Sequence, residues 1–219
     1  MNCAVSGCTK TAKRYGRYCN THDTRDRRHG HPRQETVRTK DLRPYRDIVR
    51  RRIQRNADAA AWQTLETIWR QTVRHCQARL REYLGGKPAI RWERLAWEEI
   101  IKLAQAAEPR EVIETTAAMV VMQSFDPWRF RSDRAFWFQL VRRVRALAEI
   151  NIGKSVDPGT GKVKRVYRDL PPRACEALAK IILESIGIAG AKIAQLEQQE
   201  QERQADQRTK LYKELEEIV

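Results

Sequence analysis

Apolar residues recur at alternating intervals of three and four along most of the chain, which is the spacing of one face of an α-helix. Between Asp47 and Leu84 this pattern runs without a glycine or a proline, and Gly85-Gly86 then ends it. The sequence therefore predicts one long helix over residues 47–84. Similar patterns predict further helices over residues 92–107, 110–123, 133–150, 171–187 and 189–219.

Residues that favour helix ends support these boundaries. Pro109 stands where a helix begins, a place at which proline is tolerated. Ser132 is a good N-cap for the helix that follows it, because its hydroxyl can accept a free backbone N–H. Asp126-Pro127 interrupts the helical pattern, and Pro171-Pro172 opens the next helix.

Only one segment has the pattern of strands. Residues 154–168 contain a turn-forming run from Asp157 to Gly161, followed by alternation that places Val163, Arg165 and Tyr167 on one face. A short basic β-hairpin is therefore predicted. A basic helix followed by a basic hairpin is the order of a DNA-reading helix with a wing. An ordinary surface hairpin that joins two helices is the alternative.

The C-terminal segment, residues 188–219, is helical in pattern but very polar. Residues 195–208 are rich in Gln and Glu, whereas Leu211, Leu215 and Ile218 recur at steps of four and three. A long polar helix is marginally stable alone in water. We therefore expect this helix to pair with another helix of the chain, with a second copy of the protein, or with a host protein. A solvated tail is the alternative.

The first 22 residues contain four candidate metal ligands. Cys3, Cys8, Cys19 and His22 have the spacing C-x4-C-x10-C-x2-H. Two close pairs of soft or borderline ligands, joined by a short loop, are typical of a structural Zn²⁺ site whose shell is closed to water. Such a site folds a segment too small to build its own core. Zinc is therefore the expected cofactor.

Two alternatives bear on this site. A disulfide framework is disfavoured because the cysteine count of five is odd, the rest of the chain is poor in cysteine and no signal peptide precedes the motif. His22 is the favoured fourth ligand, but His29 and His31 are close enough in the sequence to compete with it.

The block around these ligands resembles a zinc module found at the start of phage and mobile-element proteins, including some HNH-type homing endonucleases. The matching features are Gly7 before Cys8, the basic loop of residues 14–17, and a basic helix after His22 that ends in residues 30–32, Gly-His-Pro. The resemblance covers residues 1–33 and implies a zinc-stabilised module that contacts nucleic acid. It implies nothing about the rest of the chain.

Together these patterns predict a mainly α protein with one short basic hairpin and a long C-terminal helix. The expected organisation is a zinc-binding module at residues 1–33, a basic linker at 34–46, a helical domain at 47–187 with the hairpin at 154–168, and the polar helix at 188–219.

The charge distribution indicates nucleic acid as the partner. The net charge is +15, and residues 1–60 hold 16 basic and 6 acidic residues, residues 129–168 hold 11 and 3, and residues 184–219 hold 5 and 8. Two basic blocks on a neutral scaffold are typical of a surface that follows phosphates. The predicted contact residues are Arg14, Arg17, Arg25, Arg27, Arg28, Arg50, Arg51, Arg52, Arg55, Arg142, Arg143, Lys154, Lys162, Lys164 and Arg165.

We therefore expect a nucleic-acid-binding protein, with double-stranded DNA as its partner, that acts as a transcription, replication or recombination accessory factor. A protein that docks on a host machine such as RNA polymerase is one alternative, and a zinc-containing nuclease is another. Catalysis is disfavoured because His75 is the only histidine outside the zinc block, and no Asn follows it at useful spacing. The acidic residues of the predicted helices lie among basic neighbours, so ion pairs explain them better than a metal site does.

Two further expectations concern location and stacking. No apolar run approaches the roughly 18–20 residues of a membrane span, so we expect an intracellular protein with no membrane partner. The resemblance of the zinc block implies a phage or mobile element as the source, and hence a bacterial cytoplasm. Trp128 lies among arginines in a loop, unlike the other tryptophans, which fall in helical patterns. It is a candidate for stacking on a base.

Overall fold

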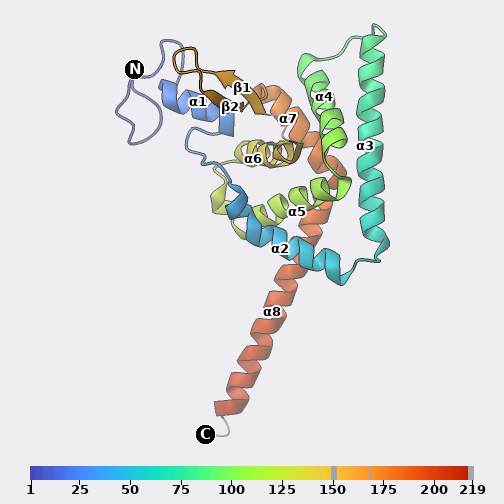
Figure 1. The fold of residues 1–219 in the computed structure, drawn as a ribbon. Coiled ribbons are helices and arrows are strands. Elements are labelled where there is room, and N and C mark those ends of the chain that lie inside the picture. The colour runs from blue at the N-terminus through green and yellow to red at the C-terminus, as the bar shows by residue number, and fades with distance from the viewer. Residues whose placement is uncertain (149–151, 168, 217–219) are drawn as a thin grey trace.

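The computed structural model describes residues 1–148, 152–167 and 169–216 (Figure 1). The fold is mainly α, with a small N-terminal module and a long C-terminal helix, which confirms the predicted class. The elements in chain order are α1 (Asn20–His29), α2 (Thr39–Arg55), α3 (Ala60–Leu84), α4 (Arg91–Ala106), α5 (Pro109–Phe125), α6 (Asp133–Arg145), β1 (Ile152–Val156), β2 (Val163–Tyr167), α7 (Pro172–Ile182) and α8 (Ile188–Glu216).

Helix α5 lies at the centre of the helical body. Between Val112 and Met122 its side chains are buried on nearly every side, among them Ile113, Ala117, Met119 and Val121. Helices α2, α3, α6 and α8 pack around it. A helix without a polar face is stable only when other helices enclose it. The four neighbouring helices therefore lie where they cover the apolar residues of α5.

Helix α8 crosses α5 closely because of one glycine. A Cβ atom at Gly190 would lie 2.6 Å from Cβ of Val120 and 2.9 Å from the carbonyl oxygen of Ala117. The backbone of α8 therefore rests directly on α5. Beyond this crossing α8 leaves the body and continues as a single helix (Figure 1), along which Leu211 and Tyr212 are exposed. No helix within the described ranges is long and apolar enough to cross a bilayer.

The prediction of one helix over residues 47–84 is wrong, because the segment forms two helices, α2 and α3. At Asn56 the backbone leaves the helical region, and the side-chain amide donates a hydrogen bond to the carbonyl of Arg52. Ala59 is extended and precedes α3. The signal for this break was present in Asn56 and Asp58, which favour turns. It is weaker than the glycine or proline signal that the pattern lacks.

Helix α2 also begins earlier than predicted, at Thr39, so part of the expected linker at residues 34–46 is helical. Asp41 stabilises this start, because its carboxylate accepts the backbone N–H of Arg38 at 3.0 Å. Pro44 lies inside the helix and is exposed. It removes one backbone hydrogen bond there without burying an unpaired group.

The later helices differ from prediction mainly at their ends. Helix α6 ends at Arg145, followed by a 3-10 turn at Ala146–Ala148, and Ile150, the predicted end, lies outside the described residues. A π-helical turn at Leu183–Gly187 leads from α7 into α8, so Gly187 does not break the chain's helical course. Val219, the predicted end of the last helix, also lies outside the described residues.

The predicted hairpin is present. Strands β1 and β2 are antiparallel, with Ile152 paired to Tyr167 and Val156 paired to Val163. Its first strand begins two residues before the predicted start, and the predicted last residue, Arg168, lies outside the described residues. Figure 1 shows the hairpin near α1, on the side of the body that carries the N-terminal module.

We expect Gly190→Val to lower the free energy of unfolding by about 1–3 kcal/mol, because the added atoms overlap α5. Thermal unfolding followed by circular dichroism measures this. The matched control is Gly85→Val, since a Cβ there would lie 3.4 Å from its nearest neighbour and φ is −78°. Equal stability of the two variants would contradict the close crossing of α5 and α8.

Candidate metal centre and adjoining basic groove

The four predicted ligands lie on a small module that precedes the helical body. An isolated bridge between Asn2 and Thr11 closes a loop, and Gly7, with φ 79°, makes the turn inside it. Cys3 and Cys8 lie on this loop. The buried apolar cluster of the described module consists of Cys3, Val5 and Cys19, and Pro32 near the end of the module is also buried. Its interior is therefore built mainly from the candidate ligands.

Helix α1 supplies the other half of the site. Cys19 is the residue before the helix, with an extended backbone, and His22 lies in the first turn. Residues three apart at a helix start face the same side, which brings the Cys19 thiol and the His22 imidazole together. The position of α1 is thus tied directly to the ligands.

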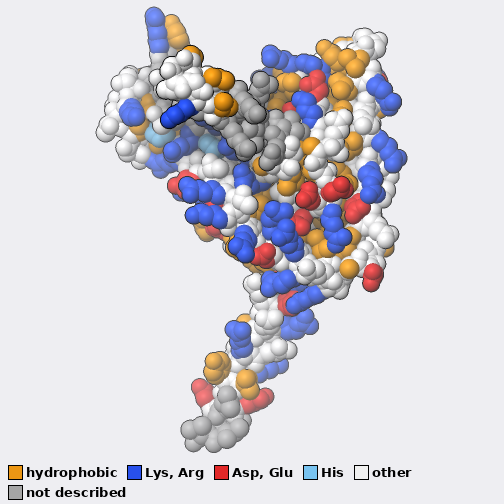
Figure 2. Space-filling view, viewed as in Figure 1, with side chains coloured by type: hydrophobic (Ala, Val, Ile, Leu, Met, Phe, Trp, Pro, Cys, Tyr) orange, Lys and Arg blue, Asp and Glu red, His pale blue; other side chains and the backbone are white. Residues whose placement is uncertain are grey.

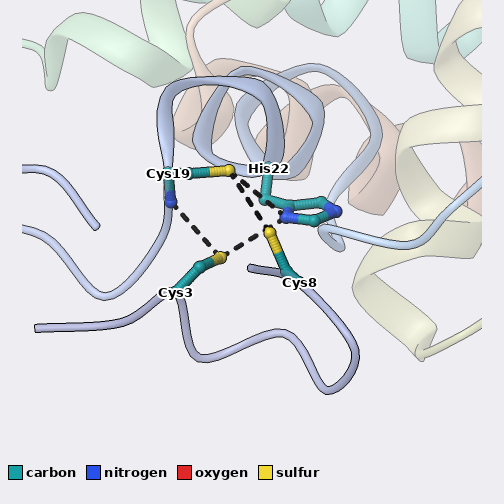
Figure 3. Close-up of side chains that lie close together, drawn as sticks. All are labelled: Cys3, Cys8, Cys19 and His22. Carbon is teal, nitrogen blue, oxygen red and sulfur yellow. Dashed lines mark hydrogen bonds between the residues drawn. The ribbon is translucent and has the colours of Figure 1, made fainter. Parts of the chain in front are cut away.

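The ligand atoms of the four side chains converge (Figure 3). Sγ of Cys3 and Sγ of Cys19 each lie 3.4 Å from Nδ1 of His22, and Sγ of Cys8 lies 4.0 Å from Sγ of Cys19. All four ligand atoms lie within 4.8 Å of one another, and all the cysteines are free thiols. The group can hold a metal ion.

The surroundings of Cys3 favour its thiolate. Burial raises the pKa of this thiol, but hydrogen bonds from the backbone N–H groups of Cys19 and Val5 and contacts with His22 and Cys8 outweigh it. The pKa of Cys3 consequently falls to about 6. The backbone N–H of Cys19 lies 3.3 Å from Sγ of Cys3. A thiolate is the form that binds a metal.

The two alternative fourth ligands lie elsewhere. Nδ1 of His29 is 3.1 Å from Nε2 of Gln139, and Nδ1 of His31 accepts the backbone N–H of Arg33. Burial, together with the charge of Arg142, lowers the pKa of His29 to about 4. Both imidazoles are therefore engaged outside the ligand group, and His22 completes it.

Two buried glutamines fix the module to the helical body. Gln139 of α6 is fully buried, and its Oε1 accepts the backbone N–H of Val37 at 2.9 Å. Gln34 is also buried, and its side chain accepts the N–H of Arg131 and donates to the carbonyl of Arg129. Each glutamine therefore pairs buried backbone groups of a segment far away in the sequence.

A close backbone contact and an ion pair complete this junction. Gly30 ends α1 with φ 76°, and a Cβ there would lie 2.6 Å from the carbonyl oxygen of Arg134. Only glycine allows α1 to approach α6 so closely at this φ. The guanidinium of Arg134 lies 3.5 Å from Asp26 of α1 and 2.7 Å from Glu176 of α7.

A groove of about 710 Å³ runs along this junction. Its charged lining residues come from three parts of the chain. They are Arg25 of α1, Glu35 and Arg38 just before α2 with Lys40 and Asp41 in its first turn, and Arg129 of the turn before α6. His29 also lines it. We call this feature the junction groove. Figure 2 shows basic side chains gathered over the module and the edge of the body beneath it, with acidic side chains among them.

The predicted basic residues of the module are at its surface. Arg14, Arg17, Arg25 and Arg27 are exposed, and none of them has an ion-pair partner among the described residues. Arg28 is also exposed but pairs with Asp169, which Arg142 contacts at 3.1 Å as well. Arg143 donates to the hydroxyl of Thr39.

The predicted cluster on α2 is engaged within the protein. Arg52 pairs with Glu197 at 3.0 Å and also with Glu200, and its side chain is 17% exposed. The remaining pairs join Arg50 to Glu114, Arg51 to Glu197 and Arg55 to Glu200. Part of the positive charge of α2 is therefore balanced by α5 and α8. The polar start of α8 therefore pairs with α2 of the same chain, which is one of the partners that the sequence led us to expect for this helix.

The remaining predicted positions lie on or near the hairpin. Lys162 is exposed at the turn. The side chains of Lys154, Lys164 and Arg165 lie outside the described residues, so those predictions stand as made. Trp128 is 85% exposed, as its loop position indicated.

The sequence analysis missed the residues that build the junction. Gln34, Gln139 and Arg129 were not singled out, and Arg38 and Lys40 were assigned to a linker. A single amide or arginine inside a helical pattern carries no local signal of a distant partner. The one available sign was Gln139 on the otherwise apolar inner stripe of α6.

Comparison of the chain with protein-family models, with curated protein sequences and with solved structures gives no match in any of the three. The resemblance of residues 1–33 to phage zinc modules therefore remains a prediction. The function has to be argued from the site itself.

We expect Gln139→Leu to loosen the module from the body, because it leaves the N–H of Val37 buried and unpaired, at a cost of about 1–3 kcal/mol. Hydrogen–deuterium exchange should show faster exchange at residues 31–38, with the core of α5 still protected. The control is Gln198→Leu, since Gln198 makes an exposed bond to Glu202. Unchanged exchange at Val37 in Gln139→Leu would exclude the proposed anchoring role.

Proposed function

We propose that this protein is a zinc-stabilised nucleic-acid-binding protein whose partner is double-stranded DNA. The observation that carries the proposal is that two of the four metal ligands, Cys19 and His22, begin the helix that carries Arg25, Arg27 and Arg28. A metal bound there would fix the direction of these arginines relative to the body. It would act structurally.

Zinc is the metal that the donor set fits best. A tetrahedral Zn²⁺ with Zn–S near 2.3 Å and Zn–N near 2.0 Å places sulfurs roughly 3.8 Å apart and sulfur and nitrogen roughly 3.5 Å apart. The distances here are 4.0 Å between Cys8 and Cys19 and 3.4 Å between His22 and each of Cys3 and Cys19. Three thiols with one imidazole also disfavour Mg²⁺ and Ca²⁺, which prefer oxygen ligands.

DNA fits the charge of the surface better than an acidic protein does. The exposed arginines of the module are spread over a loop and a helix, so they can contact successive phosphates along a backbone. We propose that the protein uses this DNA binding as an accessory factor in transcription, replication or recombination. The resemblance of residues 1–33 favours a phage or mobile-element source and a bacterial cytoplasm.

The ion pairs of the carboxylates support a protein that binds DNA without cleaving it. Glu99 pairs with Arg145 at 2.7 Å, Glu98 with Arg94 at 2.7 Å, and Glu114 with Arg46 at 2.9 Å. Carboxylates held by arginines are poor ligands for the Mg²⁺ ions of a nuclease. Helix α8 supports a second, compatible function, because its exposed end offers Leu211 and Tyr212 to a partner protein or a second copy.

We expect protein purified without chelator to hold about one zinc per chain, measured by inductively coupled plasma mass spectrometry. Cys8→Ser should lose most of it, because an alcohol is a weak zinc ligand. Cys76→Ala is the control, since this buried thiol lies in α3, away from the ligand group. Full retention of zinc in a Cys3/Cys8 double variant would rule out the site.

We expect the protein to bind a duplex of about 20 base pairs regardless of sequence, with an affinity that falls steeply as salt rises. Fluorescence anisotropy over a salt series measures this. A chelated sample should bind at least about 10-fold more weakly, while circular dichroism shows the helical body intact. Absence of binding at low salt would end the proposal.

A further inference from the structure

We propose that the junction groove is the site where a phosphate segment of the DNA backbone binds, held by Arg25, Arg38 and Lys40. This inference rests on the proposed function and adds a binding surface to it. Two of these three cations, Arg38 and Lys40, were not among the contact residues that the sequence predicted. The groove joins the zinc module to the helical body, so the site exists only when the two parts are docked.

The ion pairs of the groove leave three cations for a ligand. Arg129 is already held, since it lies 3.1 Å from Asp41 and 3.4 Å from Glu35 and donates to the carbonyl of Thr36. In contrast, Arg25, Arg38 and Lys40 are exposed and form no ion pair in the described part of the chain, although, together with the backbone N–H of Arg38, the charge of Lys40 helps to lower the pKa of Asp41. Three unpaired cations around one groove suit a polyanion.

The start of α2 does not itself hold the anion. Asp41 accepts the N–H of Arg38 at 3.0 Å, so this helix end already faces a carboxylate. The cationic side chains, not the helix dipole, therefore make the groove attractive to phosphate. The Asp41 carboxylate also accepts a hydrogen bond from Arg129, which lines the groove.

A neutral donor also lines the groove. Because Oε1 of Gln139 accepts the N–H of Val37, its Nε2 faces Nδ1 of His29, which must be an acceptor. Burial lowers the pKa of His29 to about 4, so its imidazole is neutral near pH 7. The proton then lies on Nε2. His29 can donate a hydrogen bond without adding a charge.

The groove is held in shape before a ligand arrives. One wall is α1, fixed by the ligand group and by Gly30 on α6, and the other is the start of α2, fixed through Gln34 and Gln139. A site that is already ordered loses little entropy on binding. Arg27 of the same helix does not line this groove and lies beside Arg28 and Asp169 instead.

The test compares three variants with the parent on the same duplex. In Arg25→Ala/Arg38→Ala/Lys40→Ala, the dissociation constant should rise at least about 10-fold near 100 mM salt, and the slope of log K against log salt should fall by about 2–3. The control is Arg74→Ala/Arg81→Ala/Arg91→Ala, which removes three exposed cations of α3 and α4, across the body from α1 in Figure 1. It should bind like the parent.

A third variant keeps the test decisive if the groove triple variant does not fold. Glu35→Gln removes a carboxylate that is 79% exposed at the groove, and it should tighten DNA binding about 2-fold at low salt. Parent-like binding by a folded, zinc-loaded groove variant would overturn the inference and leave the proposed function standing. Glu35→Gln binding like the parent would also count against it. If the parent itself binds no DNA, the proposed function fails first.

Discussion

The constraint on which this structure depends is the shortage of apolar residues in its N-terminal module. The module's buried apolar cluster consists of Cys3, Val5 and Cys19, which is far too little to offset the conformational entropy of about 20 ordered residues. Bonds between a metal ion and the four ligands would supply much of the missing free energy, in addition to the contacts that α1 makes with α6. Since α1 begins at two of those ligands, a bound metal would couple the fold of the module to the position of the helix that docks on α6.

Charge has two different roles in this protein. On α2, Arg52 and its neighbours pair with Glu197 and Glu200, and these pairs hold the start of α8 on the body. On the module and around the start of α2, several exposed cations make no such ion pair among the described residues, namely Arg14, Arg17, Arg25, Arg27, Arg38 and Lys40. A net charge of +15 is therefore not a measure of one binding surface. The position of each acidic residue decides which arginines remain available to a ligand.

Local patterns in the sequence predicted the features that depend on near neighbours. The ligands are separated by short intervals, so Cys3, Cys8, Cys19 and His22 could be identified together, and periodicity gave most of the helices. The junction could not be predicted, because its bonds join distant residues: Val37 and Gln139 are 102 positions apart, and Arg52 and Glu197 are 145 apart. The break at Asn56 was missed for a different reason, since no glycine or proline marks it.

The close crossing at Gly190 also affects what the far end of α8 can do. The exposed stretch of this helix at residues 201–214 spans about 21 Å at 1.5 Å per residue. It is continuous with the turn that lies directly on α5, without an intervening loop. A molecule held at Leu211 and Tyr212 would therefore stand at a set distance and angle from the metal centre. The rigid helix would therefore keep two bound molecules at a fixed separation, which a flexible tail could not do.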